Sequence, residues 1–266
     1  MSRPSDDQPG QQSGDQADAW RGPAERGRLY AGTSGFAYPS WVPRFYAPGR
    51  ASRHLLPAYA ARLPAVELHH TFYRRPSADA IARWLVQTPT HFRFCPKAQR
   101  GAAWRAWKSD DPSDPMAWLA ASFEVFDDRL GCVLLSAPGK MERDDDALAR
   151  LLAARPAGLP LALELPHSSW ADDAVHTRLN AAGVTLVATD WDDREEPDLR
   201  RIGRFLYLRL RRTTYSEADV ARWADRLEPF LADGLDAYAF FRHDDVGESA
   251  LRAEALLVRS REITGS

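Results

Sequence analysis

The sequence predicts an α/β fold, a single eight-stranded parallel (β/α)8 barrel of the TIM type. Three observations carry this prediction: short apolar runs alternate eight times with helical patterns, the runs are apolar at nearly every position, and 266 residues suit one such domain. Continuous apolar strands are typical of a parallel sheet covered by helices on both faces. An open doubly wound sheet is the competing architecture, and no G-x-G-x-x-G motif follows the first run to support its dinucleotide-binding form.

The first 28 residues form a polar segment that we expect to be a disordered tail, and the barrel is expected to span residues 29–266. Ser, Asp, Gln, Gly, Pro and Arg dominate this tail, and only Trp20 offers a large apolar side chain. Such a segment buries too little apolar area to offset the entropy lost on ordering.

The first four units follow the tail in order. Each begins with an apolar run that predicts a buried strand and continues with a helical pattern. Ser77 and Asp79 fit the cap and the first turn of the second helix. The predicted strands are 29–35, 65–69, 91–95 and 130–135, and the predicted helices are 52–63, a segment from 77, 115–127 after a long loop, and 144–154.

The last four units repeat the pattern. In the third, seventh and eighth helices, Leu, Phe and Trp recur at spacings of three and four, which is typical of an amphipathic helix. The predicted strands are 161–165, 184–189, 205–210 and 237–241, and the predicted helices are 174–181, a short segment near 199, 217–231 and 249–259.

Composition excludes several classes of function. The net charge of −2 gives no overall attraction to nucleic acid or to an anionic membrane, although it is compatible with a local basic patch on the surface. No apolar run approaches the roughly 20 residues that span a bilayer. The N-terminus lacks the basic start and apolar core of a secretory signal. Cys95 and Cys132 lie in apolar segments and are expected to be buried free thiols, which fits a cytoplasmic protein.

A series of motifs runs in order along nearly the whole chain after the tail. They are Gly32-Thr33-Ser34-Gly35 with Tyr38, Trp41, Phe45 and Tyr46; 66–74; Trp84, Thr88-Pro89, Phe92, Phe94 and Lys97; Ala162-Leu163-Glu164 with His167 and Trp170; Asp190; Tyr207, Arg209 and Tyr215; and 237–241. This series resembles the uncharacterised family DUF72, also called YecE-like. The resemblance implies a TIM-like barrel and no particular reaction.

Four strand ends depart from the pattern of that family. His69-His70 stands where an Asn-rich pair is usual, and Pro166-His167 where Arg-His is usual. Arg211-Arg212 replaces a common His-Gly pair, and Arg242-His243 replaces a common Asn pair. These departures leave open whether this chain retains any activity that the family shares.

Two glutamates lie within predicted strands near their carboxyl ends, where barrels of this type carry their chemistry. If Glu67 and Glu164 both point inward, they would serve as the catalytic acid and base. The alternative is structural, in which each glutamate pairs with an inward arginine such as Arg209 and fixes the barrel mouth. Two carboxylates at strand ends also suggest a glycosidase, a weak signal in any barrel.

Histidines and acids near the strand ends raise the question of a metal, because barrel hydrolases and isomerases build metal sites from such groups. Apart from His69 and His70, no closely spaced cluster occurs. Neighbouring strand residues point to opposite faces, so at most one of these two histidines would enter the site. No cofactor or metal site is predicted, and a divalent metal is the less favoured alternative.

Basic side chains cluster at the ends of the seventh and eighth strands, whose loops frequently form a phosphate site in such barrels. Arg209 and Arg242 offer guanidinium groups suited to phosphate or carboxylate, and Lys97 adds a point charge from the third strand. The alternative is that the neighbouring Arg211 and Arg212 are solvated. The predicted partner is a small anionic molecule or phosphoester, with His69, His167 and Asp190 also in the binding set.

Aromatic residues occupy most of the loops. Interleaved with arginines, they are suited to stacking on bases or sugar faces. The alternative is that long loops need small cores of their own. The expected ligand contacts are Tyr38, Trp41, Tyr73 and Trp170.

These observations predict a hydrolase or lyase that acts on a phosphorylated or otherwise anionic ligand at the mouth of the barrel. A nucleic-acid-binding or processing protein is the second hypothesis, and it requires a continuous basic stripe leading to the mouth. A non-catalytic ligand-binding protein is the third.

Overall fold

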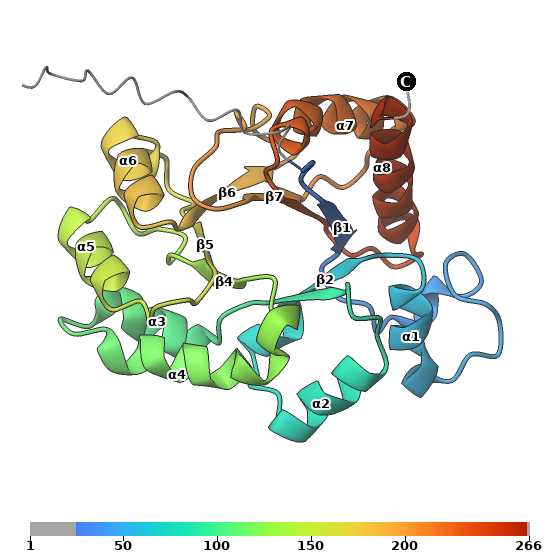
Figure 1. Cartoon of the computed structure of the whole chain (residues 1–266), viewed down its shortest axis with the longest axis horizontal. Coiled ribbons are helices and arrows are strands. Elements are labelled where there is room, and N and C mark those ends of the chain that lie inside the picture. The colour runs from blue at the N-terminus through green and yellow to red at the C-terminus, as the bar shows by residue number, and fades with distance from the viewer. Residues whose placement is uncertain (1–24, 265–266) are drawn as a thin grey trace, which may run out of the picture.

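Eight parallel β-strands lie at the centre of the molecule, and α-helices surround them (Figure 1). The computed structural model describes residues 25–264. Every predicted strand is present within a few residues of its expected bounds. The strands are β1 (Leu29–Thr33), β2 (Ala65–Leu68), β3 (Arg93–Pro96), β4 (Val133–Ser136), β5 (Leu161–Glu164), β6 (Thr185–Asp190), β7 (Leu206–Leu210) and β8 (Ala237–Phe241).

The strands form two hydrogen-bonded sheets. A curled six-stranded sheet has the order β1-β8-β7-β6-β5-β4, and β2 pairs with β3 in a two-stranded sheet. All pairs are parallel. Isolated bridges join the small sheet to both edges of the large one, between Ser34 and Glu67 on one side and between Lys97 and Leu134 on the other. The carboxyl ends of β2 and β3 therefore lie next to those of β1 and β4.

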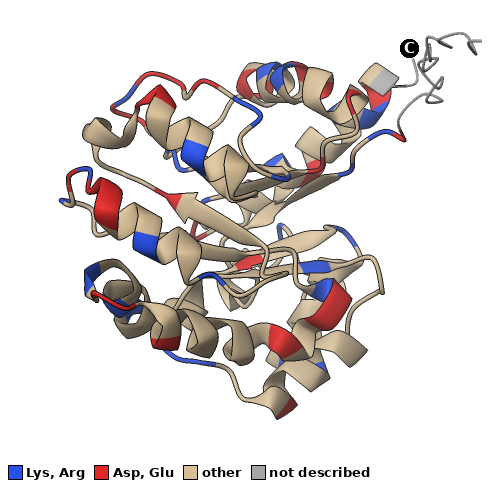
Figure 2. Ribbon diagram, turned by 60° about the vertical axis from the view of Figure 1, so that its left-hand side comes forward, with Lys and Arg blue, Asp and Glu red and all other residues tan. Residues whose placement is uncertain are grey.

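Eight α-helices occur among the described residues, and they carry most of the charged side chains together with the loops (Figure 2). Ser77 caps α2 by accepting a hydrogen bond from the Ala80 amide, as its position in the sequence predicts. Ser216 and Asp219 form a reciprocal capping box at the start of α7. The helices are α1 (Leu55–Ala60), α2 (Ala78–Val86), α3 (Arg100–Lys108), α4 (Ser113–Phe123), α5 (Asp145–Ala153), α6 (Asp173–Ala181), α7 (Glu217–Ala232) and α8 (Glu248–Thr264).

Two predictions about helices were wrong. The loop expected after the third strand contains α3, which begins after Gln99 accepts a hydrogen bond from the Ala102 amide and which buries Trp107. Conversely, no helix connects β6 to β7. Residues 191–205, all described, contain no regular element, because their first half is a run of charged residues without an apolar period.

The predicted tail lies mostly outside the described residues. Its last residues make ordered contacts: Arg26 donates to both carboxylate oxygens of Glu228 at 2.5 and 2.6 Å, and the Gly27 amide donates to the Leu231 carbonyl at 2.8 Å. Arg26 and Gly27, which the prediction assigned to the tail, therefore contact α7.

The apolar core has two layers. The larger one fills the space between the strands and the helices. The smaller one is a cluster that takes at least one side chain from each of the eight strands, including Cys95, Tyr207 and Phe240. Side chains alternate along each strand, so one face of the strands meets this inner cluster while the other meets the helices.

Local details of the core agree with the sequence. Cys95 and Cys132 are buried free thiols, as predicted. At Gly32 a methyl group would stand 2.1 Å from the Ala65 carbonyl oxygen, so this glycine permits the close approach of β1 to β2. No helix among residues 25–264 is both long and apolar enough to cross a membrane.

Candidate functional site

Arg209 on β7 is the centre of a buried charge network at the carboxyl ends of the strands. Its Nε and Nη2 donate to the two carboxylate oxygens of Glu67 on β2, both at 3.0 Å. Its Nη1 donates to Glu164 on β5 at 2.5 Å. The arginine is 2% exposed. One guanidinium thus brings together the two glutamates that the sequence singled out, from both sheets.

Glu67 is completely buried and fully hydrogen-bonded. Besides Arg209, its carboxylate accepts from the Ser34 hydroxyl at 2.7 Å and from the Tyr207 hydroxyl at 3.0 Å. Burial by itself would raise the pKa of this carboxyl, but the positive charges of Arg209 and Arg211 hold it well below its usual range. Glu67 is therefore an ionised anchor for Arg209 with no surface open to a ligand.

Glu164 is less enclosed. The Ser136 hydroxyl donates to it at 2.6 Å and the Thr189 hydroxyl at 3.3 Å, while Lys97 Nζ lies 3.9 Å from its second oxygen. Burial favours the neutral acid, yet Arg209 and then Lys97 lower the pKa of Glu164 below its ordinary value. At neutral pH this side chain is an ionised carboxylate that accepts hydrogen bonds.

A cavity of about 340 Å³ opens beside Glu164. Its volume lies within the range of small-molecule sites. Three residues that the sequence assigned to the site, Lys97, Glu164 and Arg209, are in its wall. The lining residues are Lys97, Glu164, Leu165, Pro166, Val187, Thr189, Trp191, Arg194, Arg209 and Arg211.

Arg211 is a largely buried cation in this wall without a carboxylate partner. Its Nη1 donates to the Ser34 hydroxyl at 2.7 Å, and its Nε has no hydrogen-bond partner among the described residues. No ion pair joins it to any carboxylate of residues 25–264. Burial and the neighbouring Arg209 lower the pKa of Arg211. The sequence interpretation placed this residue in solvent as an alternative, and the structure places it in the cavity.

His69 and Tyr73 lie after β2, at the side of this network. Burial lowers the pKa of His69 to about 4, so its imidazole is neutral at pH 7. Its Nδ1 is buried without a hydrogen-bond partner in the described part of the chain. Tyr73 packs edge-on against His69 with ring centres 5.9 Å apart and is 67% exposed. Both residues are thus near the site, with Tyr73 on the surface.

Tyr38 stands at the edge of the same region. Its hydroxyl donates to the Ser34 carbonyl at 2.9 Å, and its ring stacks on His243 at 4.9 Å. Burial raises the pKa of Tyr38 to about 12, so it is a neutral hydrogen-bonding group. Trp41 packs against Tyr38 and is fully buried.

Two further residues from the predicted binding set support loops. Trp170 is 2% exposed and donates from its indole to the Met141 carbonyl at 3.0 Å. His167 accepts a hydrogen bond from the Ser169 amide and so caps a short 3-10 helix, Ser168–Trp170. Neither residue, nor Trp41, is in the wall of the cavity. These side chains follow the alternative interpretation, in which loop aromatics form small cores.

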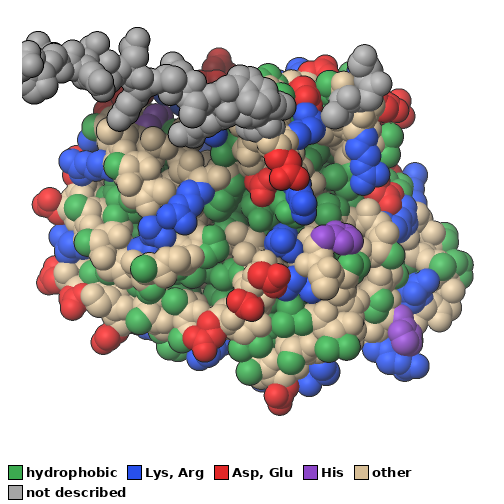
Figure 3. All heavy atoms as spheres, viewed as in Figure 1, with side chains coloured by type: hydrophobic (Ala, Val, Ile, Leu, Met, Phe, Trp, Pro, Cys, Tyr) green, Lys and Arg blue, Asp and Glu red, His purple; other side chains and the backbone are tan. Residues whose placement is uncertain are grey.

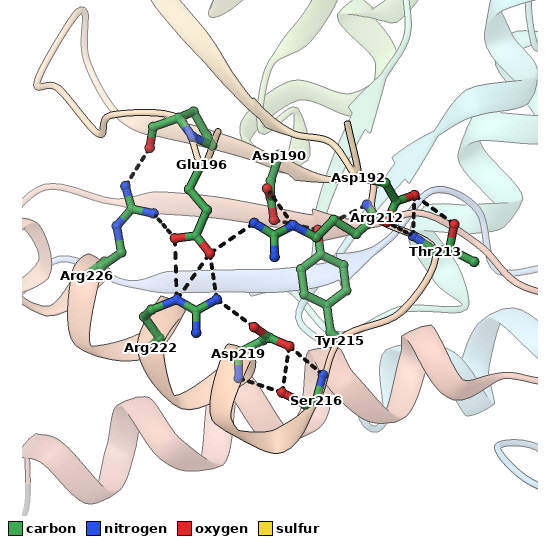
Figure 4. A network of polar contacts seen from close by, with 11 residues as sticks. Asp190, Asp192, Glu196, Arg212, Thr213, Tyr215, Ser216, Asp219, Arg222 and Arg226 are labelled. Atoms are coloured by element: carbon green, nitrogen blue, oxygen red, sulfur yellow. Dashed lines mark hydrogen bonds and ion pairs between the residues drawn. The ribbon is translucent and has the colours of Figure 1, made fainter. Parts of the chain in front are cut away.

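Asp190 belongs to a second polar network, on the side of β6 that faces α7 (Figure 4). It is fully buried and accepts from Arg212 Nε and from the Tyr215 hydroxyl, both at 2.9 Å. Arg212 continues to Glu196 at 3.0 Å. Glu196 also pairs with Arg222 at 2.6 Å and Arg226 at 2.9 Å, both on α7. The segment 191–205, which lacks a helix, is held to α7 in this way.

Arg242 lies outside the central cavity. It is exposed and lines a separate hollow of about 610 Å³ beside the start of α8. The start of α8, which follows the loop after β8, holds a carboxylate of the chain itself. Asp244 accepts hydrogen bonds from the amides of Val246 at 2.7 Å, Gly247 at 2.5 Å and Ser249. The amides at the start of α8 are therefore bonded to a side chain of the same loop.

Among the described residues, no group of three or more His, Cys, Asp or Glu side chains is placed to hold an ion. Arg209 lies between Glu67 and Glu164. His69 is near the central network and His167 caps a loop helix.

Comparisons with known proteins agree on the family. The model of the family described as "Protein of unknown function DUF72" matches residues 30–264. The UPF0759 protein YunF of Bacillus subtilis (strain 168) is 27% identical over 150 residues, 53% of this chain, and the chain spans about half (52%) of the length of that relative.

Solved structures show the same fold. A DUF72 family protein of Thermotoga maritima MSB8 superposes with a TM-score of 0.75 at 22% identity, covering 90% of this chain and 99% of that one. A DUF72 family protein of Enterococcus faecalis V583 gives 0.71 at 17% identity, covering 88% and 96%. The order of motifs, the parallel strands and these matches lead to one conclusion: the chain belongs to the DUF72 family, whose function is unknown.

Proposed function

We propose that this chain binds a small anionic molecule, a carboxylate or a phosphoester, in the cavity at the carboxyl ends of β5, β6 and β7. The observation that carries the proposal is Arg211, a mostly buried guanidinium without a carboxylate partner among residues 25–264. A buried charge is costly unless it is paired. A ligand anion at this position would supply the missing partner.

The charge balance of the site supports an anion. Three largely buried cations, Lys97, Arg209 and Arg211, stand against two carboxylates, Glu67 and Glu164, and the exposed Arg194 adds a fourth positive charge to the cavity wall. Most of this surplus positive charge is buried in the cavity wall, where it attracts an anion more strongly than at a solvated surface.

We further propose that the site performs chemistry, of a hydrolase or lyase type, in which Glu164 accepts a proton. Its carboxylate is ionised and is part of the cavity wall. Glu67 has a different part in this proposal: it holds Arg209 in place and exchanges no proton, because its oxygens are fully bonded and unexposed. A non-catalytic ligand-binding protein would use the same cavity, and turnover in a substrate screen distinguishes the two.

The test is a calorimetric titration of the protein with inorganic phosphate and with malonate, using uncharged malonamide as the control ligand. Arg211→Gln should weaken binding of either anion about tenfold to hundredfold, since a hydrogen bond to a charged group contributes about 1.5–3 kcal/mol. Arg201→Gln is the matched control variant, because Arg201 is an exposed arginine paired with Asp233. Equal affinities of the two variants would refute the assignment of the site.

Nucleic acid is the weaker candidate. On the face shown in Figure 3, acidic side chains stand between the basic ones instead of leaving a continuous basic stripe. Most arginines around α7 are paired with acids, as in the cluster at Glu196. Phosphate-backbone binding needs unpaired surface cations, so this pattern favours a small ligand.

For the fold, we propose that the eight strands close into one TIM-type barrel. The inner apolar cluster takes side chains from all eight strands, and bridges connect both edges of the small sheet to the large one. The Ala98 amide, which donates to the Leu134 carbonyl, and the Gly131 amide, which donates to the Phe94 carbonyl, lie at one closing point, between β3 and β4. In a closed barrel both amides should exchange with deuterium as slowly as those of β7, and fast exchange would indicate an open edge.

A further inference from the structure

We propose that the ligand is an aldehyde or ketone bearing a carboxylate or phosphate, and that Lys97 Nζ condenses with its carbonyl group to form an imine. This inference rests on the anion site proposed above and adds its substrate class. Of the two reaction types proposed for that site, the imine favours a lyase over a hydrolase. A protonated imine stabilises the carbanion that remains when a bond to the adjacent carbon breaks.

Lys97 is held firmly by the backbone. It directly follows β3, its amide donates to the Leu68 carbonyl at 3.2 Å, and its carbonyl accepts from the Thr71 hydroxyl at 2.6 Å. Because both backbone groups are bonded, the side chain enters the cavity from a fixed point. Preorganisation of this kind is what a reacting group requires.

The amino group of Lys97 is mostly buried and makes few contacts. The side chain is 12% exposed, and Nζ lies 3.9 Å from a Glu164 oxygen and 5.1 Å from the centre of the Phe72 ring. It makes no hydrogen bond to any residue in the described range, whereas Arg209 beside it makes three to carboxylates. The amine is thus available to a molecule in the cavity.

Lysine is rare in this chain. Lys97, Lys108 and Lys140 are its only lysines among 35 basic residues, and the other two are exposed. Arginine supplies the remaining cations, but a guanidinium does not lose its proton in proteins and is not a nucleophile. The one enclosed position with a primary amine is therefore the one that admits nucleophilic chemistry.

The surroundings of Lys97 favour the reactive form of the amine. Burial and then the charge of Arg209 lower the pKa of Lys97, while Glu164 and Glu67 act in the opposite direction. A nucleophilic lysine is activated by this combination of desolvation and a neighbouring cation.

The step balances without an added oxidant or reductant. The neutral Nζ attacks the carbonyl carbon, a C–N bond forms as the C=O π bond breaks, and one proton moves from nitrogen to oxygen to give a carbinolamine. A proton from solvent converts the hydroxyl to water, which leaves as the nitrogen lone pair forms the C=N bond, so the product is an iminium that keeps one N–H. Glu164, the nearest carboxylate, stabilises the resulting iminium charge, and Arg211 holds the anionic group.

The test is trapping with glyoxylate and, separately, pyruvate, each in the presence of cyanoborohydride, followed by peptide mass spectrometry. The expected result is one carboxymethyl or carboxyethyl group per chain, located on Lys97 and formed faster than on Lys108 or Lys140. Its rate should rise at lower pH than the rates of these two exposed lysines, which report ordinary amine reactivity in the same sample. Inorganic phosphate should compete for labelling of Lys97 alone.

Lys97→Arg separates this inference from the proposed function. It keeps a cation in the cavity wall and removes the nucleophile, so the labelling at position 97 should be lost, while the anion site is tested separately by phosphate binding to the unaltered protein. Binding of phosphate by the unaltered protein together with labelling no faster at Lys97 than at Lys108 would overturn the imine and leave the anion site standing. Absence of phosphate and malonate binding in the unaltered protein would overturn the anion site itself.

Discussion

Replacing Arg209 by Met is the most informative perturbation of this structure. The substitution removes the cation between Glu67 and Glu164 while keeping an unbranched side chain in the wall. Three hydrogen bonds to carboxylates are lost. At about 1.5–3 kcal/mol each they sum to about 4.5–9 kcal/mol, and the desolvation cost of the guanidinium, no longer incurred, offsets part of this. We expect a loss of about 3–5 kcal/mol in the free energy of unfolding near neutral pH.

The pH dependence of this loss tests the reasoning. In the unaltered protein the pKa values of Glu67 and Glu164 lie below their ordinary values. Their contribution to the free energy of unfolding is therefore complete when the pH is above the pKa of the unfolded chain, and it is lost as the pH falls through the pKa of the folded state. Without Arg209, burial dominates at Glu67 and its folded pKa moves above the unfolded value. That glutamate then destabilises the variant as the pH rises, and the gap between the two proteins should narrow towards about pH 4.

The assay is urea unfolding followed by tryptophan fluorescence across this pH range. Arg201→Met, in an exposed pair, serves as the control and should change stability by less than about 1 kcal/mol. Adding Glu67→Gln to Arg209→Met should recover part of the loss, since the amide need not be ionised. A loss below about 1 kcal/mol for Arg209→Met, or a gap that stays constant with pH, would refute the buried network as described.

Four further predictions follow from single contacts. Glu196→Gln removes the shared partner of three arginines and should speed proteolysis within residues 191–205 while costing only about 1 kcal/mol, because the cluster is partly exposed. Asp244→Asn should lower the melting temperature by a few degrees, roughly 1 kcal/mol, and create weak sulfate binding at the start of α8, measurable by calorimetry. Gly32→Ala places a methyl group against the Ala65 carbonyl and should destabilise by about 2 kcal/mol or more in urea unfolding. The lowered pKa of His69 means that stability is lost as the pH falls below about 6.5, and an NMR titration should find its imidazole still neutral at pH 6.

The strand pattern was predictable because continuous apolar runs report burial directly. The strand register that brings Glu67, Glu164 and Arg209 together could not be predicted. It depends on which residues of neighbouring strands pair with each other, and the sequence pattern does not fix this pairing. Arg211 illustrates a signal that was available: it follows Arg209 by two residues, and side chains two apart in an extended segment share a face. A solvated Arg211 was kept as the alternative to an anion-binding one, because arginine is common throughout the chain.

The roles of Trp41, Trp170 and Asp244 needed three-dimensional information. A tryptophan in a loop carries the same sequence signal whether it packs inward or faces a ligand, and both of these pack inward. Asp244 likewise follows β8 as a ligand-binding acid would, but its carboxylate caps its own helix. Local hydrogen bonds of this kind leave little trace in composition or periodicity.

The sharing of Arg209 between the two sheets also restricts how the molecule moves. Because one guanidinium clamps β2 to β5 and β7, the strand ends form a stiff floor under the cavity. Any adjustment to an incoming molecule must then come from the rim, where residues 191–205 follow β6 and supply Trp191 and Arg194 to the cavity wall. Structures determined with and without a bound ligand should superpose at the strand ends and differ in residues 191–205. We expect the sequences of relatives that bind different ligands to differ in this segment as well.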